Sequence, residues 1–164
     1  MRTALVLFGA AAMVGSYVLM LRGWRSRQRR QGFLPEPPTP TGTAATVVGA
    51  IPGLFVGTTF AGDWLDRVAA HGLSDRATAE LTLATDGVHV DRDGATELYL
   101  PYDSLDDAAP GEALAGKVMG PDGLLLLTWR LGGSVLTSAF RADDHAQHAR
   151  LAAAIRAQIP VEAR

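Results

Sequence analysis

The four histidines are the side chains best suited to bind a metal ion or to transfer a proton near neutral pH. They are His71, His89, His145 and His148. His145 and His148 are three residues apart at the start of a predicted helix, beside Asp144, so they share a helix face. A zinc site needs three or four ligands, and the sequence offers no further one. We therefore interpret both histidines as solvated residues near the start of that helix.

Acidic residues form two further patterns. Asp91 and Asp93, with a glycine following, resemble the start of a calcium loop. The distal glutamate of such a loop is missing, and the pair lies between two alternating segments, so we predict a hairpin turn. Asp103, Asp106 and Asp107 form an acidic patch, for which the sequence predicts a solvated loop.

No serine stands in a recognisable nucleophile motif. The serines after residue 30 are Ser74, Ser104, Ser134 and Ser138. Their surroundings match neither a catalytic triad nor a G-x-S-x-G elbow, and the chain also lacks a Walker loop and a G-x-G-x-x-G loop. Trp64 and Trp129 are predicted to pack in or around the core rather than to stack on a ligand. We expect no enzyme activity, no cofactor and no metal.

Charge is distributed unevenly along the 164 residues. Residues 31–164 hold 9 basic and 17 acidic side chains, a net charge of −8. Nucleic-acid binding needs a basic surface, so we exclude it. The absence of cysteine excludes disulfides and thiolate metal sites.

The N-terminal segment predicts a membrane anchor. Thr3 to Leu21 holds 19 uncharged residues, long enough to cross the ~30 Å apolar core of a bilayer. Arginines follow at once and favour the cytoplasmic side. We predict a single-pass protein of the cell membrane with its N-terminus outside and its C-terminal domain in the cytoplasm. The predicted membrane-interface residues are Arg22, Trp24, Arg25, Arg27, Arg29 and Arg30.

A cleaved signal peptide is the alternative for this segment. The arginines lie on the wrong side of the apolar run for that alternative, and no small-x-small cleavage site follows Leu21. We therefore divide the chain into an anchor with its basic flank (1–30), a proline-rich linker (31–52) and a domain (53–160). The prolines of the linker favour extended polyproline II structure and a semi-rigid spacer.

Alternation of apolar and polar residues predicts β-structure in much of the domain. A short strand over 53–60 precedes a brief helix over 64–71, which Asp63 is expected to cap. Three antiparallel strands follow at 77–84, 88–91 and 98–100, with Ala79, Leu81 and Leu83 on one face.

The last third of the chain combines strands with a final helix. A loop over 103–114 and a short strand near 117–119 precede 123–130, which is apolar on both faces and is predicted to cross the sheet interior. A Gly-Gly turn leads to a strand over 134–140. A helix over 144–159, with one apolar stripe and a capping box at Asp144, closes the domain.

This order of elements resembles the pleckstrin-homology-like (PH-like) fold, and the chain resembles the actinobacterial membrane proteins that join one span to such a domain. The residues that carry the resemblance are 57–73 (GTTFAGDWLDRVAAHGL), 85–92 (TDGVHVDR), 115–118 (AGKV) and 123–132 (GLLLLTWRLG). The resemblance implies a mainly β fold: a small antiparallel barrel or sandwich of about seven strands, capped by a C-terminal helix, beside the N-terminal transmembrane helix.

The resemblance supplies no catalytic motif. We predict a non-enzymatic interaction module or scaffold at the cytoplasmic face, bound to the bilayer through residues 3–21 and to a protein partner. An accessory subunit of a larger membrane or transport complex is the first alternative, and an extracytoplasmic binding domain is the second. Specific phosphoinositide binding is not expected, because residues 53–66 contain no lysine or arginine to neutralise a headgroup.

Overall fold

The computed structural model describes residues 12–23, 31–42 and 44–160, and the chain divides into two units, Met1–Phe33 and Leu34–Arg164. In the first unit, residues 12–23 form a helix that ends next to Arg22. Within the described ranges, no helix is both long and apolar enough to cross a membrane. Residues 3–11 of the predicted span lie outside the described residues, as do Trp24, Arg25, Arg27, Arg29 and Arg30.

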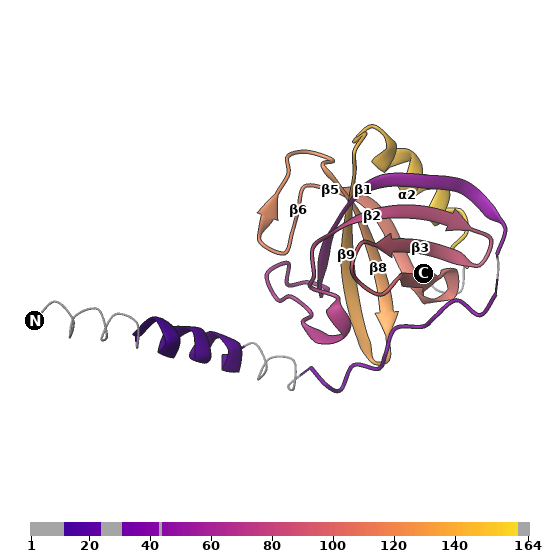
Figure 1. The fold of residues 1–164 in the computed structure, drawn as a ribbon. Coiled ribbons are helices and arrows are strands. Elements are labelled where there is room, and N and C mark those ends of the chain that lie inside the picture. The colour runs from indigo at the N-terminus through magenta and orange to yellow at the C-terminus, as the bar shows by residue number, and fades with distance from the viewer. Residues whose placement is uncertain (1–11, 24–30, 43, 161–164) are drawn as a thin grey trace, which may run out of the picture. The chain divides into compact units, whose positions relative to one another are not determined.

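The second unit is mainly β, as predicted (Figure 1). Its strands and helices are, in chain order, β1 (Thr46–Phe60), η1 (Ala70–Gly72), β2 (Ala77–Ala84), β3 (Gly87–Arg92), β4 (Leu98–Pro101), η2 (Tyr102–Ser104), β5 (Leu105–Gly111), β6 (Ala113–Leu114), β7 (Lys117–Val118), β8 (Leu124–Leu131), β9 (Ser134–Ala142) and α2 (Gln147–Arg156).

Seven strands form one antiparallel sheet in the order β4-β3-β2-β1-β9-β8-β5. β1 joins the two halves of the sheet, because β2 pairs with one of its edges and β9 with the other. Figure 1 shows β2 and β3 steeply inclined to β8 and β9, so the sheet curls around a shared interior. β6 and β7 pair separately as a small hairpin.

The predicted three-stranded meander is confirmed. Ala79, Leu81 and Leu83 of β2 are buried, and Leu81 lies opposite Val90 of β3. Glu80 is exposed on the other face. Period-two alternation therefore gave both the strands and their inner face.

Two glycines allow β1 to pair closely with β9. A Cβ atom on Gly53 would lie 2.3 Å from the carbonyl oxygen of Arg141, so only glycine fits there. At Gly57 a register shift interrupts the ladder, and φ is +137°, a value that favours glycine.

The interior is apolar around Trp129, whose indole N–H donates to Ser138 Oγ at 2.9 Å. Ser138 Oγ also bonds to the Thr58 hydroxyl at 2.8 Å. Trp129 is fully buried, as predicted for core packing, whereas Trp64 is 45% exposed. The predicted terminal helix is confirmed as α2, which packs its apolar stripe on β5 and β8. The capping box predicted at Asp144 is wrong, because the helix begins at Gln147 after Ala146, whose N–H donates to Asp144 Oδ1.

The predicted helix over 64–71 is wrong. Asp63 Oδ1 accepts the N–H groups of Leu65 and Asp66 as a cap would, but only a 3₁₀ turn, η1, follows. Val68 N–H instead donates to the Thr58 carbonyl, and Thr58 N–H to the carbonyl of Leu73. These hydrogen bonds hold the segment against β1 as turns around a single bridge between Thr59 and Arg67, and so short a helix has little stability of its own.

The predicted loop over 103–114 is also wrong, because most of it forms β5 and β6. β5 is the edge strand beside β8, a position where its proline, Pro110, is tolerated. Asp106 and Asp107 are not simply solvated: Asp106 pairs with Arg130 of β8 at 2.9 Å, and Asp107 with Arg156 of α2 at 2.7 Å.

The predicted linker, residues 31–52, overlaps the domain. β1 begins at Thr46, and Leu34 is buried in the main core. The Leu34 carbonyl lies 3.0 Å from His71 Nε2. We refer to the described residues 34–42 and 44–45 as the strap, because this proline-rich segment runs along the domain before β1 begins (Figure 1).

Candidate functional site

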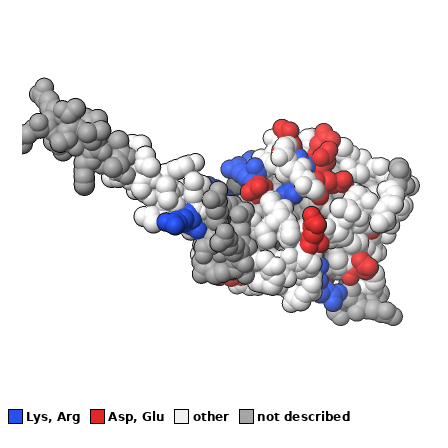
Figure 2. Space-filling view, turned by 60° about the horizontal axis from the view of Figure 1, so that its bottom comes forward, with Lys and Arg blue, Asp and Glu red and all other residues white. Residues whose placement is uncertain are grey.

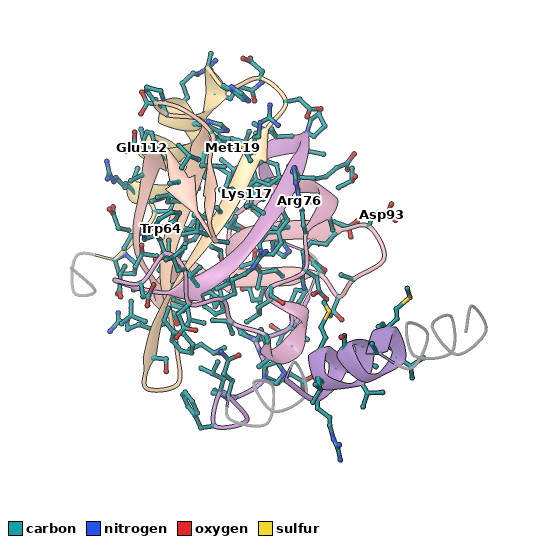
Figure 3. All side chains as sticks on the ribbon, turned by 90° about the vertical axis from the view of Figure 1, so that its left-hand side faces the viewer. Trp64, Arg76, Asp93, Glu112, Lys117 and Met119 are labelled. Atoms are coloured by element: carbon teal, nitrogen blue, oxygen red, sulfur yellow. The ribbon has the colours of Figure 1, made fainter. Side chains whose placement is uncertain are left out.

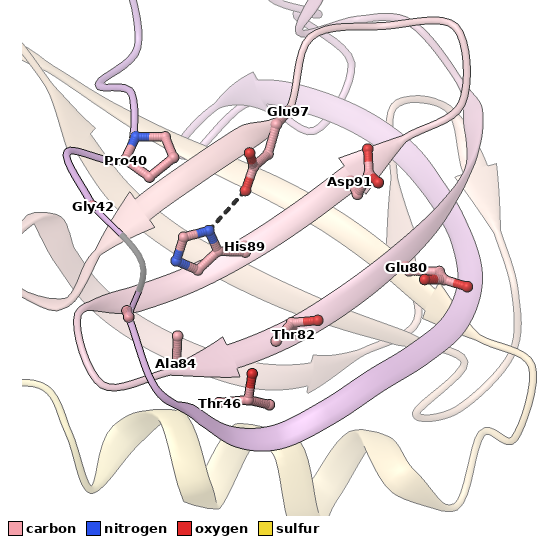
Figure 4. Close-up of a pocket in the computed structure, with 10 residues that line it drawn as sticks. Pro40, Gly42, Thr46, Glu80, Thr82, Ala84, His89, Asp91 and Glu97 are labelled. Carbon is pink, nitrogen blue, oxygen red and sulfur yellow. Dashed lines mark hydrogen bonds and ion pairs between the residues drawn. The ribbon is translucent and has the colours of Figure 1, made fainter.

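Polar side chains meet under the strap, on the outer face of β2 and β3. They border an open hollow of about 460 Å³, which Figure 4 shows in close-up. The lining residues are Pro40, Gly42, Ala44, Thr46, Glu80, Thr82, Ala84, His89, Asp91 and Glu97. Strand alternation places Glu80, Thr82, His89 and Asp91 on this face, and the strap forms the opposite wall.

His89 lies at the centre of the hollow between two carboxylates. Its Nδ1 is 2.7 Å from Glu97 Oε1, and its Nε2 is 3.1 Å from Asp86 Oδ1. Partial burial opposes protonation, but the hydrogen bonds and charges of Asp86 and Glu97 outweigh it, so the pKa of His89 is raised. The ring also lies against Tyr99, with centroids 4.8 Å apart.

The remaining ionisable groups that line the hollow are acidic. Glu80 and Asp91 lie directly opposite each other on β2 and β3, which places two like charges side by side. Such a pair is mildly destabilising. The hollow therefore attracts cations and repels anions, and its groups favour a protonated imidazole in their midst.

A second, smaller hollow of about 170 Å³ lies between the strap and Arg92. Arg92 is buried, and its guanidinium donates to the carbonyls of Gly72 and Thr96 and lies over the Phe55 ring. Burial lowers the pKa of Arg92 from its ordinary value. This cation therefore fixes the β3–β4 turn to η1.

The sequence interpretation of His148 as a solvated residue is wrong. His148 is fully buried; its Nε2 accepts the N–H of Ala142 at 2.9 Å, and its Nδ1 donates to the Asp122 carbonyl at 2.7 Å. Burial lowers its pKa, with the nearby His145 and Arg141 adding to the effect. The ring is thus a neutral link between β9 and the turn before β8.

His145 and the predicted turns are closer to expectation. His145 is exposed, and its Nε2 accepts from Arg141 Nε at 2.9 Å. Asp91 and Asp93 lie at the β3–β4 hairpin, so the predicted turn is confirmed. Among the described residues, no group of three or more potential ligands could hold a metal ion.

The serines are structural or lie apart from an acid–base pair. Ser138 bonds to Thr58 and Trp129, Ser74 bonds to Asp75, and Ser104 donates to the Pro101 carbonyl. Ser134 begins β9. None of these contacts joins a serine to a histidine, so within the described ranges they form no triad.

Comparison with known proteins agrees with this architecture. Residues 31–156 match the family of Bacterial PH domain-like proteins. The chain belongs to this family. No curated protein matches the chain. The match begins at residue 31, just before the strap, and ends in α2, so this PH-like domain includes residues that the sequence interpretation assigned to a linker. PH-like domains are typically non-catalytic modules that bind proteins or lipids.

The loop after β1 of this PH-like domain carries two arginines. Arg67 turns inward, where its Nη2 donates to the carbonyls of Val56 and Ser74. Arg76 is exposed, as is Asp93 at the β3–β4 turn, and Figure 3 labels both. Among the described residues of this loop, Arg76 is thus the one exposed cation, and it lacks there the companion cations that a phosphate-rich headgroup requires.

Surface charge does not compensate for this lack. Figure 2 shows acidic side chains at several places on one face of the domain, with basic side chains beside some of them. Lys117, labelled in Figure 3, is the one lysine of the chain and lies on β7. The PH-like domain thus presents an acidic surface. The sequence predicts which single residues lie on this surface, but it does not predict the hollow that the strap forms with β2 and β3.

Proposed function

We propose that this chain is a single-pass membrane protein whose PH-like domain binds a protein partner at the cytoplasmic face. The separation of charge along the chain carries the proposal. Five arginines directly follow the apolar segment 3–21, whereas residues 31–164 have a net charge of −8. Arginines placed there retain the following segment on the cytoplasmic side.

The acidic domain favours a protein over an anionic lipid headgroup. Each basic residue near a membrane contributes about 1 kcal/mol to binding of anionic lipid, and acidic residues oppose it. The loop that would face a headgroup offers Arg76 beside Asp75 and near Asp63 and Asp66 in sequence. The basic flank, Arg22, Arg25, Arg27, Arg29 and Arg30 with Trp24, would instead meet the membrane interface.

A topology experiment tests the location. Reporters active only in the cytoplasm, or only outside it, would be fused after Arg164. We expect activity from the cytoplasmic reporter alone, and replacement of the five flanking arginines by glutamine should scramble or invert insertion. Activity from the external reporter alone would refute the proposed location.

A sedimentation experiment tests the choice of partner. The fragment from Gln31 to Arg164 should stay in the supernatant with vesicles of anionic lipid at physiological salt, because it lacks the basic flank. A fragment from Arg22 should bind weakly and should be released as salt rises. Saturable, stereospecific binding of the shorter fragment to a phosphoinositide would show that the domain is a lipid sensor.

A further inference from the structure

The first half of β1 has a free edge. β1 pairs with β2 from Thr46 onward, but its pairing with β9 begins only at Gly53. Within the described residues, no backbone hydrogen bond joins 46–51 to β9 or to α2. The backbone N–H and C=O groups on such an edge can pair with another extended chain.

Irregular pairing with β2 marks the same segment. Register shifts occur between Thr46 and Val48 and again between Val48 and Ile51. Bulges of this kind are frequent at sheet edges, where they limit uncontrolled pairing with other sheets. Val47, which lies at the first of these shifts, is 57% exposed. The edge is thus accessible, but its bulges limit uncontrolled pairing with the strands of other molecules.

A groove of about 310 Å³ lies between this half of β1 and α2. Its lining residues are Val48, Ile51, Gln147, Arg150, Leu151 and Ala154. Figures 1 and 4 both show β1 and α2 side by side. The groove can accept apolar side chains that a strand paired with β1 would direct toward α2.

Arg150 gives the groove a positive charge. It is exposed, and the ion pairs found in the described part of the chain engage Arg130 and Arg156 of this domain but not Arg150. In a domain with a net charge of −8, an arginine without an acidic partner is available to an external carboxylate.

We infer that the free edge of β1 and the groove beside α2 bind an extended peptide segment of a partner protein that carries a carboxylate opposite Arg150. Backbone hydrogen bonds to β1 provide affinity, and the groove and Arg150 provide specificity. A second copy of this chain fits less well, because it would bring a second strongly acidic domain into contact. The inference rests on the proposed protein-binding function and assigns its site.

Two synthetic peptides test the inference on the full chain in detergent micelles. Each has about eight residues, with valine and threonine alternating around a central glutamate in one and a central lysine in the other. Fluorescence anisotropy should show saturable binding of the glutamate peptide, with the lysine peptide roughly tenfold weaker. Hydrogen exchange should show new protection of amides within 46–51.

Matched variants locate the site. Arg150→Glu should reverse the preference between the two peptides, whereas Arg76→Glu, the same charge change on the β1–β2 loop, should leave it intact. Ala154→Arg should block binding by filling the groove, whereas Ala153→Arg, at the exposed neighbouring position, should not. Circular dichroism of each variant confirms that it is folded.

Several results would overturn the inference. The first is no saturable binding of the glutamate peptide to the folded chain, and the second is an unchanged preference in Arg150→Glu. Protection of 46–51 that depends on protein concentration, with a dimer in sedimentation, would assign the edge to a second copy. The topology test of the proposed function does not involve this groove. A failure of the peptide-binding site can therefore be distinguished from a failure of the proposed membrane topology.

Discussion

The regions around His148 and His89 each hold an imidazole between two hydrogen-bond partners, but the partners and the burial of the ring differ. His148 lies in the buried seam between α2 and the sheet, bonded to backbone groups of Ala142 and Asp122. His89 lies on the outer face, under the strap, between two carboxylates. Burial lowers the pKa of the first, and acidic partners raise the pKa of the second.

This difference indicates that the seam beside α2 is fixed by packing, whereas the outer face under the strap can respond to its surroundings. Charge is excluded from the seam, so its contacts depend on close packing and neutral hydrogen bonds. The outer face keeps its charges partly solvated, so pH, salt or a cationic group can change their balance. Four predictions test the comparison.

The interior should be far more sensitive to truncation than the surface. Trp129→Ala should lower the free energy of unfolding by about 3–5 kcal/mol, because it leaves a cavity and removes the hydrogen bond to Ser138. Trp64→Ala, the matched change at an exposed tryptophan, should cost less than about 1 kcal/mol. Denaturant unfolding measures both; equal costs would contradict the packing described here.

The strap should stabilise the domain to which it is attached. A fragment from Gly49 to Arg164 lacks Leu34 and the start of β1, and it should be less stable than one from Gln31 by about 2–5 kcal/mol. The single change Leu34→Ala in the longer fragment should reproduce much of the loss. Identical melting temperatures for the two fragments would show that residues 31–48 are a free spacer after all.

His148 should stabilise the fold most at neutral and alkaline pH. Its pKa is lower in the folded state than the ordinary 6.5, so the unfolded state binds more protons as pH falls. His148→Gln should cost about 1–3 kcal/mol near pH 8. That cost should shrink as pH drops below about 6.5. Unfolding curves measured across this range check the slope, and a cost that grows on acidification would disprove the neutral assignment.

His89 should show the opposite dependence with a smaller amplitude. Its pKa is raised, so its contribution is complete below the unfolded value of 6.5 and is lost as pH rises through the folded value. His89→Gln should cost less than about 1 kcal/mol at pH 5 and still less at pH 8. The same series of unfolding curves, repeated with Glu97→Gln, should weaken the trend by removing one partner.

The sequence by itself determined the strands and the inner face of the sheet. Period-two alternation in β2 and β3 identifies Leu81 and Val90 as interior residues wherever the strands lie. The doubly apolar β8 predicts a strand buried on both sides, and the stripe on the last helix predicts that it packs on the sheet. These are local patterns, and each is set by the residues of one segment.

Tertiary structure alone decided the features that depend on partners distant in sequence. The segment after Asp63 has a helical pattern, but hydrogen bonds to Thr58 hold it against β1 as turns and a single bridge. Asp107 has low strand propensity, yet β8 and Arg156 hold it in β5. Leu34 lies in a segment whose prolines predict a solvated spacer, but its side chain is buried in the main core. The local sequence sets how much free energy each backbone conformation costs in a segment. The contacts that offset this cost come from residues distant in sequence, which only the fold brings close.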